Sequence, residues 1–285
     1  MKEEPDDQKI VIGEGARIAT EWSGILQYEF PDILSYPDSD RNGPFWCIGM
    51  PRTGKTRILE NIAEQDIRSR YSTVVIDPKG DLGLFAKIVQ VANETGRQDE
   101  LQVITTISDI INMAHNDQFI ERLETGKRII MVVHRGPRYP KEFFTVGMAI
   151  ILMIQSYVGK AFSAGKKVTP PLSLFIDEAH TMLYNGIDRL FSKAGSAGVM
   201  VHVFSQSVSQ MNTLIGQDNA RSILSNIKTK IFMKMQDTET VEDIDGITPE
   251  DVMGLNAREF FMTRESGVYK GRTLDVSPLS STQKI

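Results

Sequence analysis

From residue 45 onward, short apolar runs alternate with longer stretches in which apolar residues recur at helical spacing. Strands separated by helices of this length favour right-handed βαβ units, and continuous apolar runs are typical of strands buried on both faces. The pattern therefore predicts an α/β fold with a mainly parallel central sheet covered by helices on both faces. The predicted strands are residues 45–48, 73–76, 101–104, 128–133, 172–176, 199–204, 230–233, 259–263 and 269–274, and the predicted helices are residues 56–69, 82–95, 117–123, 142–157, 187–194, 218–225 and 237–243.

The N-terminal residues follow a different pattern. Apolar residues at 10–12 and 25–30 predict two short strands, and the turn-forming residues at 37–44 predict a loop after them. Residues 1–8 are charged, and we expect them to be frayed. We therefore divide the chain into an N-terminal tail with a short β element, residues 1–43, and a larger unit, residues 44–285.

Composition and charge narrow the class of protein. Of the 285 residues, 41% are hydrophobic and 24% are charged, which is typical of a globular chain and excludes wholesale disorder. Cys47 is the only cysteine, so an intramolecular disulfide is excluded and a reducing compartment is expected. The longest apolar run, residues 146–154, is well short of the ~18 residues of a membrane span, so we expect a buried helix in a soluble chain. The net charge of −5 argues against a basic, nucleic-acid-binding coat over the whole surface.

Residues 49–56, Gly-Met-Pro-Arg-Thr-Gly-Lys-Thr, fit the phosphate-loop pattern G-x-x-x-x-G-K-[ST] without a mismatch and lie between a predicted strand and a predicted helix. Gly49 and Gly54 allow the backbone to turn tightly, so that successive N–H groups and the start of the helix face an anion. Lys55 is expected to meet the β- and γ-phosphates of a nucleotide, and Thr56 to offer its hydroxyl to Mg²⁺. The predicted nucleotide-binding residues are Gly49, Pro51, Arg52, Thr53, Gly54, Lys55 and Thr56.

A second acidic motif follows the predicted strand at 172–176, which ends in Asp177 and Glu178. In P-loop enzymes such a strand is expected beside the strand of the phosphate loop, and its terminal Asp belongs to the magnesium shell. We assign that role to Asp177, and to Glu178 the orientation or deprotonation of the attacking water. The alternative is a helix N-terminus that favours acidic residues.

Gln206 follows the predicted strand at 199–204. A glutamine at this strand end is expected to reach the γ-phosphate and to sense hydrolysis, whereas the alternative is a polar loop residue. The predicted catalytic residues are Lys55, Glu178 and Gln206.

Further segments form a set with the phosphate loop: residues 74–82, 175–179, 191–199, 204–210, 224–226 and 229–232. In this order they resemble the conjugative coupling proteins of type IV secretion systems, the TraD/TraG class, within the HerA–FtsK family of ATPases. The likeness runs from about residue 44 to about residue 275. The phosphate loop alone would be unspecific, but its combination with Asp77-Pro-Lys-Gly-Asp81 and Ser205-Gln-Ser207 is far more specific.

The resemblance implies a RecA-like P-loop ATPase that uses ATP and Mg²⁺, with residues 44–285 as its motor domain. Members of the class form rings, usually of six subunits, at the cytoplasmic face of the bacterial inner membrane. They pass DNA, or a DNA-linked protein, towards the secretion channel. We therefore expect a homo-oligomer, or a monomer in isolation, with DNA and secretion-system components at the inner membrane as partners. By motif match, residues 49–56 bind the nucleotide, Asp177 and Glu178 form the second motif and Gln206 is the sensor.

Three departures from the family pattern bear on function. Coupling proteins carry N-terminal membrane helices, and this sequence shows none. Many also insert a large all-helical domain, for which residues 82–171 leave little room, so recognition tasks of that domain are in question. Many ring ATPases supply an arginine in trans. Here Lys193 and Arg221 are the candidates, and a solvated or packing cation is the alternative for each.

Several segments stay open between a structural and a functional interpretation. Asp77, Lys79 and Asp81 fit either a turn with a helix cap or a role near the nucleotide. His180 is typical of a loop residue rather than a catalyst. Arg135 and Arg138 lie in a basic loop with an aromatic residue, which fits a solvated turn or a contact with nucleic acid.

Two alternatives to a DNA motor also stay open. The first is an ATPase that moves protein, or serves secretion or pilus assembly, with no nucleic acid in the pore. The acidic balance and the missing helical insertion favour it. The second is a non-enzymatic, nucleotide-gated docking module, against which the intact pair of Asp177 and Glu178 argues.

Overall fold

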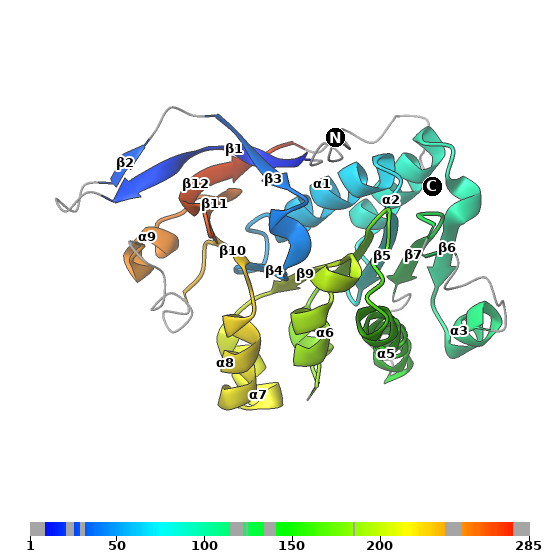
Figure 1. Ribbon diagram of the computed structural model, residues 1–285. Helices are drawn as coiled ribbons and strands as arrows, with labels where there is room; N and C mark the ends of the chain where they lie inside the picture. Colours follow the sequence, from blue (N-terminus) through cyan, green and yellow to red (C-terminus); the bar gives the residue numbers. More distant parts are fainter. Residues whose placement is uncertain are drawn as a thin grey trace.

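The computed structural model describes residues 9–20, 26–28, 32–114, 122–123, 125–133, 141–184, 186–236 and 247–275. Within this part, one sheet lies between two layers of helices (Figure 1). The expected frayed end at residues 1–8, the basic loop with Arg135 and Arg138, and the expected helix at 237–243 lie outside the described residues, as does most of the expected helix at 117–123.

Parallel strands form the centre of the sheet. In the order β10-β4-β9-β8-β5-β7-β6, every neighbouring pair is parallel. The strands β4, β5, β7, β8 and β9 are buried along their whole length, as strands covered on both faces must be. This confirms the predicted fold class. The bounds are β4 Phe45–Ile48, β5 Ser72–Asp77, β6 Leu101–Ile104, β7 Ile129–Val133, β8 Leu172–Ile176, β9 Val199–Ser205 and β10 Thr229–Met233.

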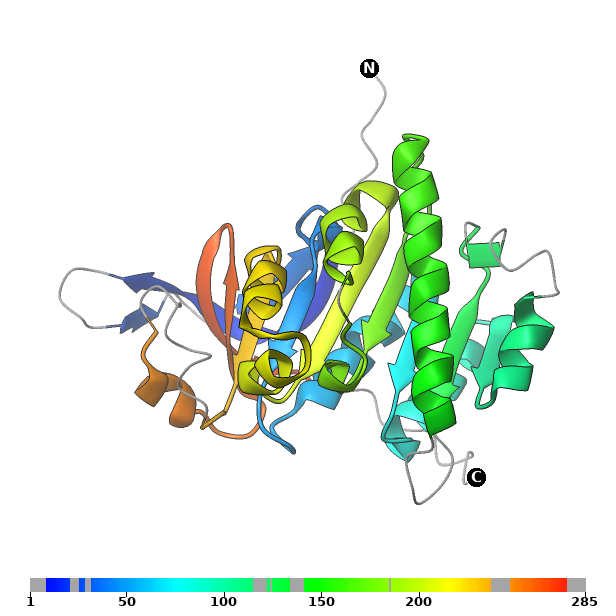
Figure 2. The same cartoon turned by 90° about the horizontal axis from the view of Figure 1, so that it is seen from below.

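Helices cover both faces of this sheet, as the alternating pattern predicts (Figure 1, Figure 2). On one face lie α1 Lys55–Arg68 and α2 Leu82–Glu94, and on the other lie α3 Ile107–Ala114, α5 Lys141–Ser163, α6 Asp188–Lys193, α7 Val208–Ile215 and α8 Gln217–Ser225. Each layer buries its own apolar cluster against the sheet. The sequence pattern missed α3, α7 and the short α9 Pro249–Met253, because helices of so few residues show little periodicity. Short 3-10 turns are η1 Asp40–Asn42, η2 Gln98–Glu100, η3 Ala179–Thr181 and η4 Gly195–Ala197.

An antiparallel extension continues the sheet beyond β10. The added strands are β11 Glu259–Arg264, β12 Gly267–Thr273, β1 Lys9–Thr20, β2 Leu26–Tyr28 and β3 Asp32–Pro37. β11 pairs with β10, β12 with β11, and β1 with β12, so the N-terminal strands belong to the same twelve-stranded sheet of the described residues. The boundary between residues 1–43 and 44–285 stays a prediction.

The first strand is longer than its apolar pattern indicates. Gly13 and Gly15 interrupt that pattern, but both are required by the pairing with β12. A Cβ at these positions would lie 2.4 and 2.2 Å from the carbonyl oxygens of Arg272 and Lys270. The strand runs on to Thr20, and β3 covers residues that the sequence pattern left unassigned, reaching only the first residue of the loop predicted at 37–44.

The long helix α5 is the one described helix that is long and apolar enough to cross a membrane, judged by length and composition alone. The sequence prediction missed this property because it counted uninterrupted apolar runs, and Gln155 and Ser156 interrupt the run. In the structure, Val146, Ile150 and Ile154 are fully buried in the apolar cluster on that face of the sheet. The predicted helix is therefore present and extends to Ser163, but only one face of it is buried, because Leu152 is 47% exposed.

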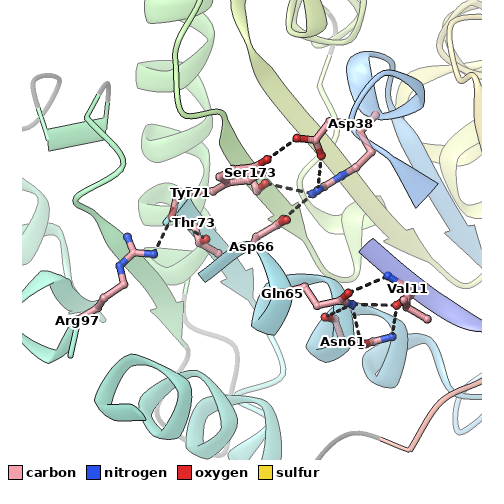
Figure 3. Close-up of polar contacts among 10 residues, drawn as sticks. Val11, Asp38, Asn61, Gln65, Asp66, Tyr71, Thr73, Arg97 and Ser173 are labelled. Atoms are coloured by element: carbon pink, nitrogen blue, oxygen red, sulfur yellow. Dashed lines mark hydrogen bonds and ion pairs between the residues drawn. The ribbon is translucent and has the colours of Figure 1, made fainter. Parts of the chain in front are cut away.

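A buried ion pair joins the segment before β4 to the end of α1. Arg41 Nη2 donates to Asp66 Oδ2 at 2.6 Å, and both side chains are fully buried. Arg41 also donates to Asp38 at 3.1 Å and to Ser173 in β8 at 3.4 Å, and the Tyr71 hydroxyl donates to Asp38. Figure 3 shows Asp38, Asp66 and Ser173 converging from three separate segments.

A second polar set attaches α1 to β1. The backbone N–H of Val11 donates to Gln65 Oε1 at 2.8 Å, and the Val11 carbonyl accepts from Gln65 at 2.9 Å and from Asn61 at 2.8 Å (Figure 3). The helix that follows the phosphate loop is thus held by β1 through Asn61 and Gln65, and near its end by Arg41.

We expect Arg41→Met to lower the free energy of unfolding by about 3–5 kcal/mol, because it leaves the Asp66 carboxylate buried without its partner. Urea denaturation of the purified chain measures this change. The matched control is Arg68→Met on α1, the helix that carries Asp66, which removes ion pairs with Glu64 and Glu94 from a side chain that is 42% exposed. We expect the control to change stability by less than about 1 kcal/mol. Equal losses in both variants would contradict a special role for the buried pair.

Candidate nucleotide site

The phosphate loop begins where β4 leaves the sheet. The N–H of Gly49 donates to the Ser205 carbonyl at the end of β9 at 3.2 Å, and the N–H of Met50 donates to the Lys234 carbonyl after β10 at 2.9 Å. A Cβ at position 49 would lie 2.7 Å from the Cβ of Met233, and Gly54 has a φ of +120°. Glycine is therefore required at both ends of the loop, as the motif predicts.

Lys55 is the first residue of α1 and reaches back across the loop. Its Nζ donates to the carbonyls of Gly49 at 2.5 Å and of Met50 at 2.9 Å, and the residue is 5% exposed. Burial lowers the pKa of Lys55, while the charges of Glu178 and Asp177 act in the opposite direction. The lysine and the two acids therefore share one electrostatic environment, as a P-loop site requires.

The other loop residues lie in three settings. The Thr53 hydroxyl donates to the Met50 carbonyl at 2.8 Å, and this hydrogen bond within the loop stabilises its conformation. Pro51 and Arg52 are exposed, and Thr56 is half-buried at the start of α1. The predicted contacts of these residues with a nucleotide remain predictions.

Asp177 and Glu178 follow the last residue of β8, at the same edge of the sheet as the phosphate loop. Asp177 is 2% exposed. Burial, with help from the nearby carboxylates of Glu178 and Asp77, raises the pKa of Asp177 to about 6, although Lys79 acts in the opposite direction. Glu178 has left-handed backbone angles, φ 44° and ψ 46°, which are uncommon for a residue with a side chain and cluster at functional sites.

The strand order corrects one expectation. β8 does not lie beside the phosphate-loop strand, because β9 is inserted between β4 and β8. Ile48 pairs with Ser205 and Ile176 with Val203, so all three strands end close to one another. Since parallel strands point the same way, the loop, Gln206 and the acids still meet at one edge of the sheet.

Gln206 comes directly after β9 and contacts Glu178. Its Nε2 donates to Glu178 Oε1 at 3.1 Å and to Oε2 at 3.0 Å. The Nδ1 of His180 lies 3.3 Å from Glu178 Oε2, and burial lowers the pKa of His180. The structure thus brings Gln206 to the acidic motif, and its role as a sensor of the γ-phosphate stays a prediction.

The Asp77-Pro-Lys-Gly-Asp segment combines both interpretations that the sequence left open. The Asp77 carboxylate accepts from the backbone N–H groups of Lys79 at 2.9 Å, Gly80 at 3.2 Å and Asp81 at 2.7 Å. Asp81 caps α2 by accepting from the N–H groups of Gly83 and Leu84. The two aspartates therefore build the turn, whereas the Lys79 ammonium forms an ion pair with Glu178.

The residues present fit a magnesium ion held partly by the chain. Among the described residues, no group of three or more His, Cys, Asp and Glu side chains could hold a metal by itself. Mg²⁺ is usually bound through one or two protein oxygens, with water and phosphate as its other ligands. The Asp177 carboxylate and the Thr56 hydroxyl are oxygen donors of this kind, so they fit the predicted role.

The two candidates for a trans-acting cation lie in ordinary surroundings. Lys193, at the end of α6, places its Nζ 5.1 Å from the centre of the Phe162 ring, which supports the interpretation as a packing cation. Arg221 is exposed on α8. The structure of a single chain does not assign either side chain to the nucleotide site, and the trans-acting role of each remains a prediction.

Sequence reasoning missed Arg258. Its N–H donates to the Thr53 carbonyl at 2.7 Å, and its φ of +75° is unusual for a residue with a side chain. The turn before β11 therefore contacts the phosphate loop directly. Nothing in the sequence marks this residue, because the contact depends on how the antiparallel extension returns to the loop.

Comparison with known proteins agrees with this geometry. Residues 171–246 match the family described as "TraM recognition site of TraD and TraG", and this range contains Asp177, Glu178 and Gln206. No curated protein matches the sequence.

Solved structures share the fold. The bacterial conjugative coupling protein TrwBΔN70 is 12% identical with a TM-score of 0.58, covering 99% of this chain and 97% of its own. The pCW3 conjugation coupling protein TcpA, with ATPγS, is 11% identical with a TM-score of 0.56, covering 95% and 67%. The genome-packaging NTPase B204 from Sulfolobus turreted icosahedral virus 2, in complex with AMPPCP, is 13% identical with a TM-score of 0.52, covering 82% and 99%.

The chain therefore has the P-loop NTPase fold seen in TrwB. The family match shows a likeness to TraD and TraG over residues 171–246, and the structural matches show the shared fold.

We expect Asp177→Asn to raise the stability of the chain at pH 8 in buffer with EDTA and no nucleotide. The pKa of about 6 in the folded state lies above the ordinary value of 3.8, so ionised Asp177 destabilises the folded state at pH values above about 6. Removing the charge should increase the free energy of unfolding by about 1–3 kcal/mol, measured by urea denaturation.

The gain should shrink as the pH falls towards 4, where the carboxyl group is protonated in the folded state. The control is Glu265→Gln, at a carboxylate that is 82% exposed, and we expect it to change stability by less than about 0.5 kcal/mol. A loss of stability in Asp177→Asn at pH 8 would contradict the account of this carboxylate.

Proposed function

We propose that the protein is an ATP-hydrolysing motor that couples or translocates DNA, or a DNA–protein substrate, to a type IV secretion or conjugation channel. The observation that carries the proposal is the meeting of Lys55, Asp177, Glu178 and Gln206 at the carboxyl edge of β4, β8 and β9. A phosphate loop alone supports only nucleotide binding, whereas a carboxylate within reach of the same site supports hydrolysis.

The chain's own groups would divide the chemistry as follows. The backbone N–H groups of residues 49–56 and the Lys55 ammonium bind the β- and γ-phosphates of ATP. Asp177 and the Thr56 hydroxyl hold Mg²⁺, which neutralises charge on the phosphates when it is bound. Glu178 accepts a proton from water while the water oxygen attacks the γ-phosphorus, and the bond to the β–γ bridging oxygen breaks to release ADP. Gln206 orients Glu178 through its two contacts with the carboxylate.

We propose the DNA substrate and the ring-shaped oligomer from the likeness of this chain to other proteins. TrwB and TcpA are conjugative coupling proteins and B204 is a genome-packaging NTPase, so proteins of this fold act in conjugation and genome packaging. We extend this role to the present chain. Its active form is a homo-oligomer, which the dilution experiment below tests. We place it in the cytoplasm at the inner face of the bacterial inner membrane, with secretion-system components as partners.

A protein-directed secretion or assembly ATPase is the second candidate. The net charge of −5 favours it, because a chain that surrounds DNA needs local positive charge to offset the phosphates. A docking module without hydrolysis is disfavoured by the position of Glu178 beside Gln206 and close to Lys55.

The test is the ATPase rate of the purified chain over a range of protein concentrations, with and without DNA. We expect hydrolysis that increases with DNA and falls on dilution. Lys55→Ala and Glu178→Gln should each reduce turnover at least about 100-fold, because the first removes phosphate binding and the second removes the proton acceptor. Lys228→Ala, at the opposite edge of the sheet, is the control and should hydrolyse ATP at the wild-type rate.

The outcomes separate the candidate functions. Stimulation by DNA that weakens with increasing salt, as counterion release requires, supports the DNA motor. Hydrolysis without any response to DNA at any protein concentration favours the protein-directed ATPase. Binding of ATP without hydrolysis would leave the docking module.

A further inference from the structure

The carboxylate of Glu178 has a partner on each of its oxygens. Lys79 forms an ion pair with Oε1, and Gln206 Nε2 donates to both oxygens. On the other side, His180 Nδ1 lies 3.3 Å from Oε2. A carboxylate offers about four lone-pair sites, and Lys79 together with Gln206 fills the sites of Oε1, so a water molecule can give its proton to Oε1 only after one of these two partners has left.

Lys79 is the partner best placed to leave. Its side chain is 37% exposed, whereas the Glu178 side chain is 5% exposed. A lysine on the rim of the site can turn into solvent without disturbing packing, and its flexible stem makes that movement easy. Gln206 contacts both oxygens and comes directly after β9, so it can keep the carboxylate oriented when the lysine leaves.

The turn that carries Lys79 is itself fixed by hydrogen bonds. The Asp77 carboxylate fixes the turn by accepting three backbone N–H groups, one of them from Lys79 itself. Although burial opposes the charge, the carboxylates of Asp177, Glu178 and Asp77 raise the pKa of Lys79. The lysine is therefore held as an ammonium ion beside the acids.

We propose that Lys79 is a positioning residue that restrains Glu178: its ammonium group occupies Oε1 of the carboxylate that accepts the proton of the attacking water, and opening of the ion pair frees this oxygen for the water. This inference rests on the proposed function, since it assigns Glu178 as the proton acceptor. It makes Lys79 a brake on turnover in the absence of DNA, without a part in nucleotide affinity.

The experiment compares Lys79→Met with the wild-type chain at saturating ATP and Mg²⁺, without DNA. We expect kcat to increase roughly two- to fivefold, which is the range that a half-exposed ion pair can restrain, with KM unchanged within about twofold. Lys79→Arg keeps the positive charge and should remain close to the wild-type rate. Lys79→Gln provides a second neutral variant, so the result does not depend on the folding of a single substitution.

The double variant Lys79→Met with Glu178→Gln shows whether the added rate passes through Glu178, and we expect it to hydrolyse no ATP. If the wild-type chain hydrolyses ATP and both neutral variants are slower or unchanged, the restraint is refuted while the proposed function stands. If neither the wild-type chain nor the neutral variants hydrolyse ATP under any condition, the proposed function fails and the inference fails with it. If Lys79 had a purely structural role, the neutral variants would change stability or KM, and kcat would not increase.

Discussion

The order of three parallel strands, β4-β9-β8, is the constraint on which the site depends. β4 leads into the phosphate loop, β9 into Gln206 and β8 into Asp177 and Glu178, and the pairing register ends all three at the same edge. Because neighbouring strands lie about 4.8 Å apart, the insertion of β9 separates the loop from the acids by roughly 10 Å. The edge above Gln206 therefore lies between the phosphate loop on one side and the acids on the other.

The same edge carries features that weaken the fold. Asp177 is a buried acid whose ionisation opposes folding, Lys55 is a buried ammonium ion, and Glu178 has left-handed backbone angles. Stability comes from elsewhere: the apolar clusters on the two faces of the sheet, and the polar contacts that fix α1 to β1 and to Arg41. Groups that would be unfavourable in a structural core are thus collected where a charged ligand would satisfy them.

The sequence predicted the fold class, most central elements and the main residues of the site, because the phosphate loop and the strand before Asp177 carry strong local signals. It did not predict that β9 separates β4 from β8, since strand order is decided by long-range pairing. The contact of Arg258 with Thr53 and the joining of β1 to β12 were missed for the same reason. Lys79 was noted only as part of a turn or a site, and the ion pair with Glu178 became visible once Asp77 was seen to orient the turn.

The central claim is that a triphosphate binds between the loop of residues 49–56 and the acids after β8. The most direct test is a crystal structure of the chain with Mg²⁺ and a non-hydrolysable ATP analogue. The account predicts that Lys55 Nζ leaves the carbonyls of Gly49 and Met50 for a phosphate oxygen, with the terminal phosphate facing Asp177 and Glu178. A nucleotide bound elsewhere, or one whose terminal phosphate is out of reach of both acids, would contradict it.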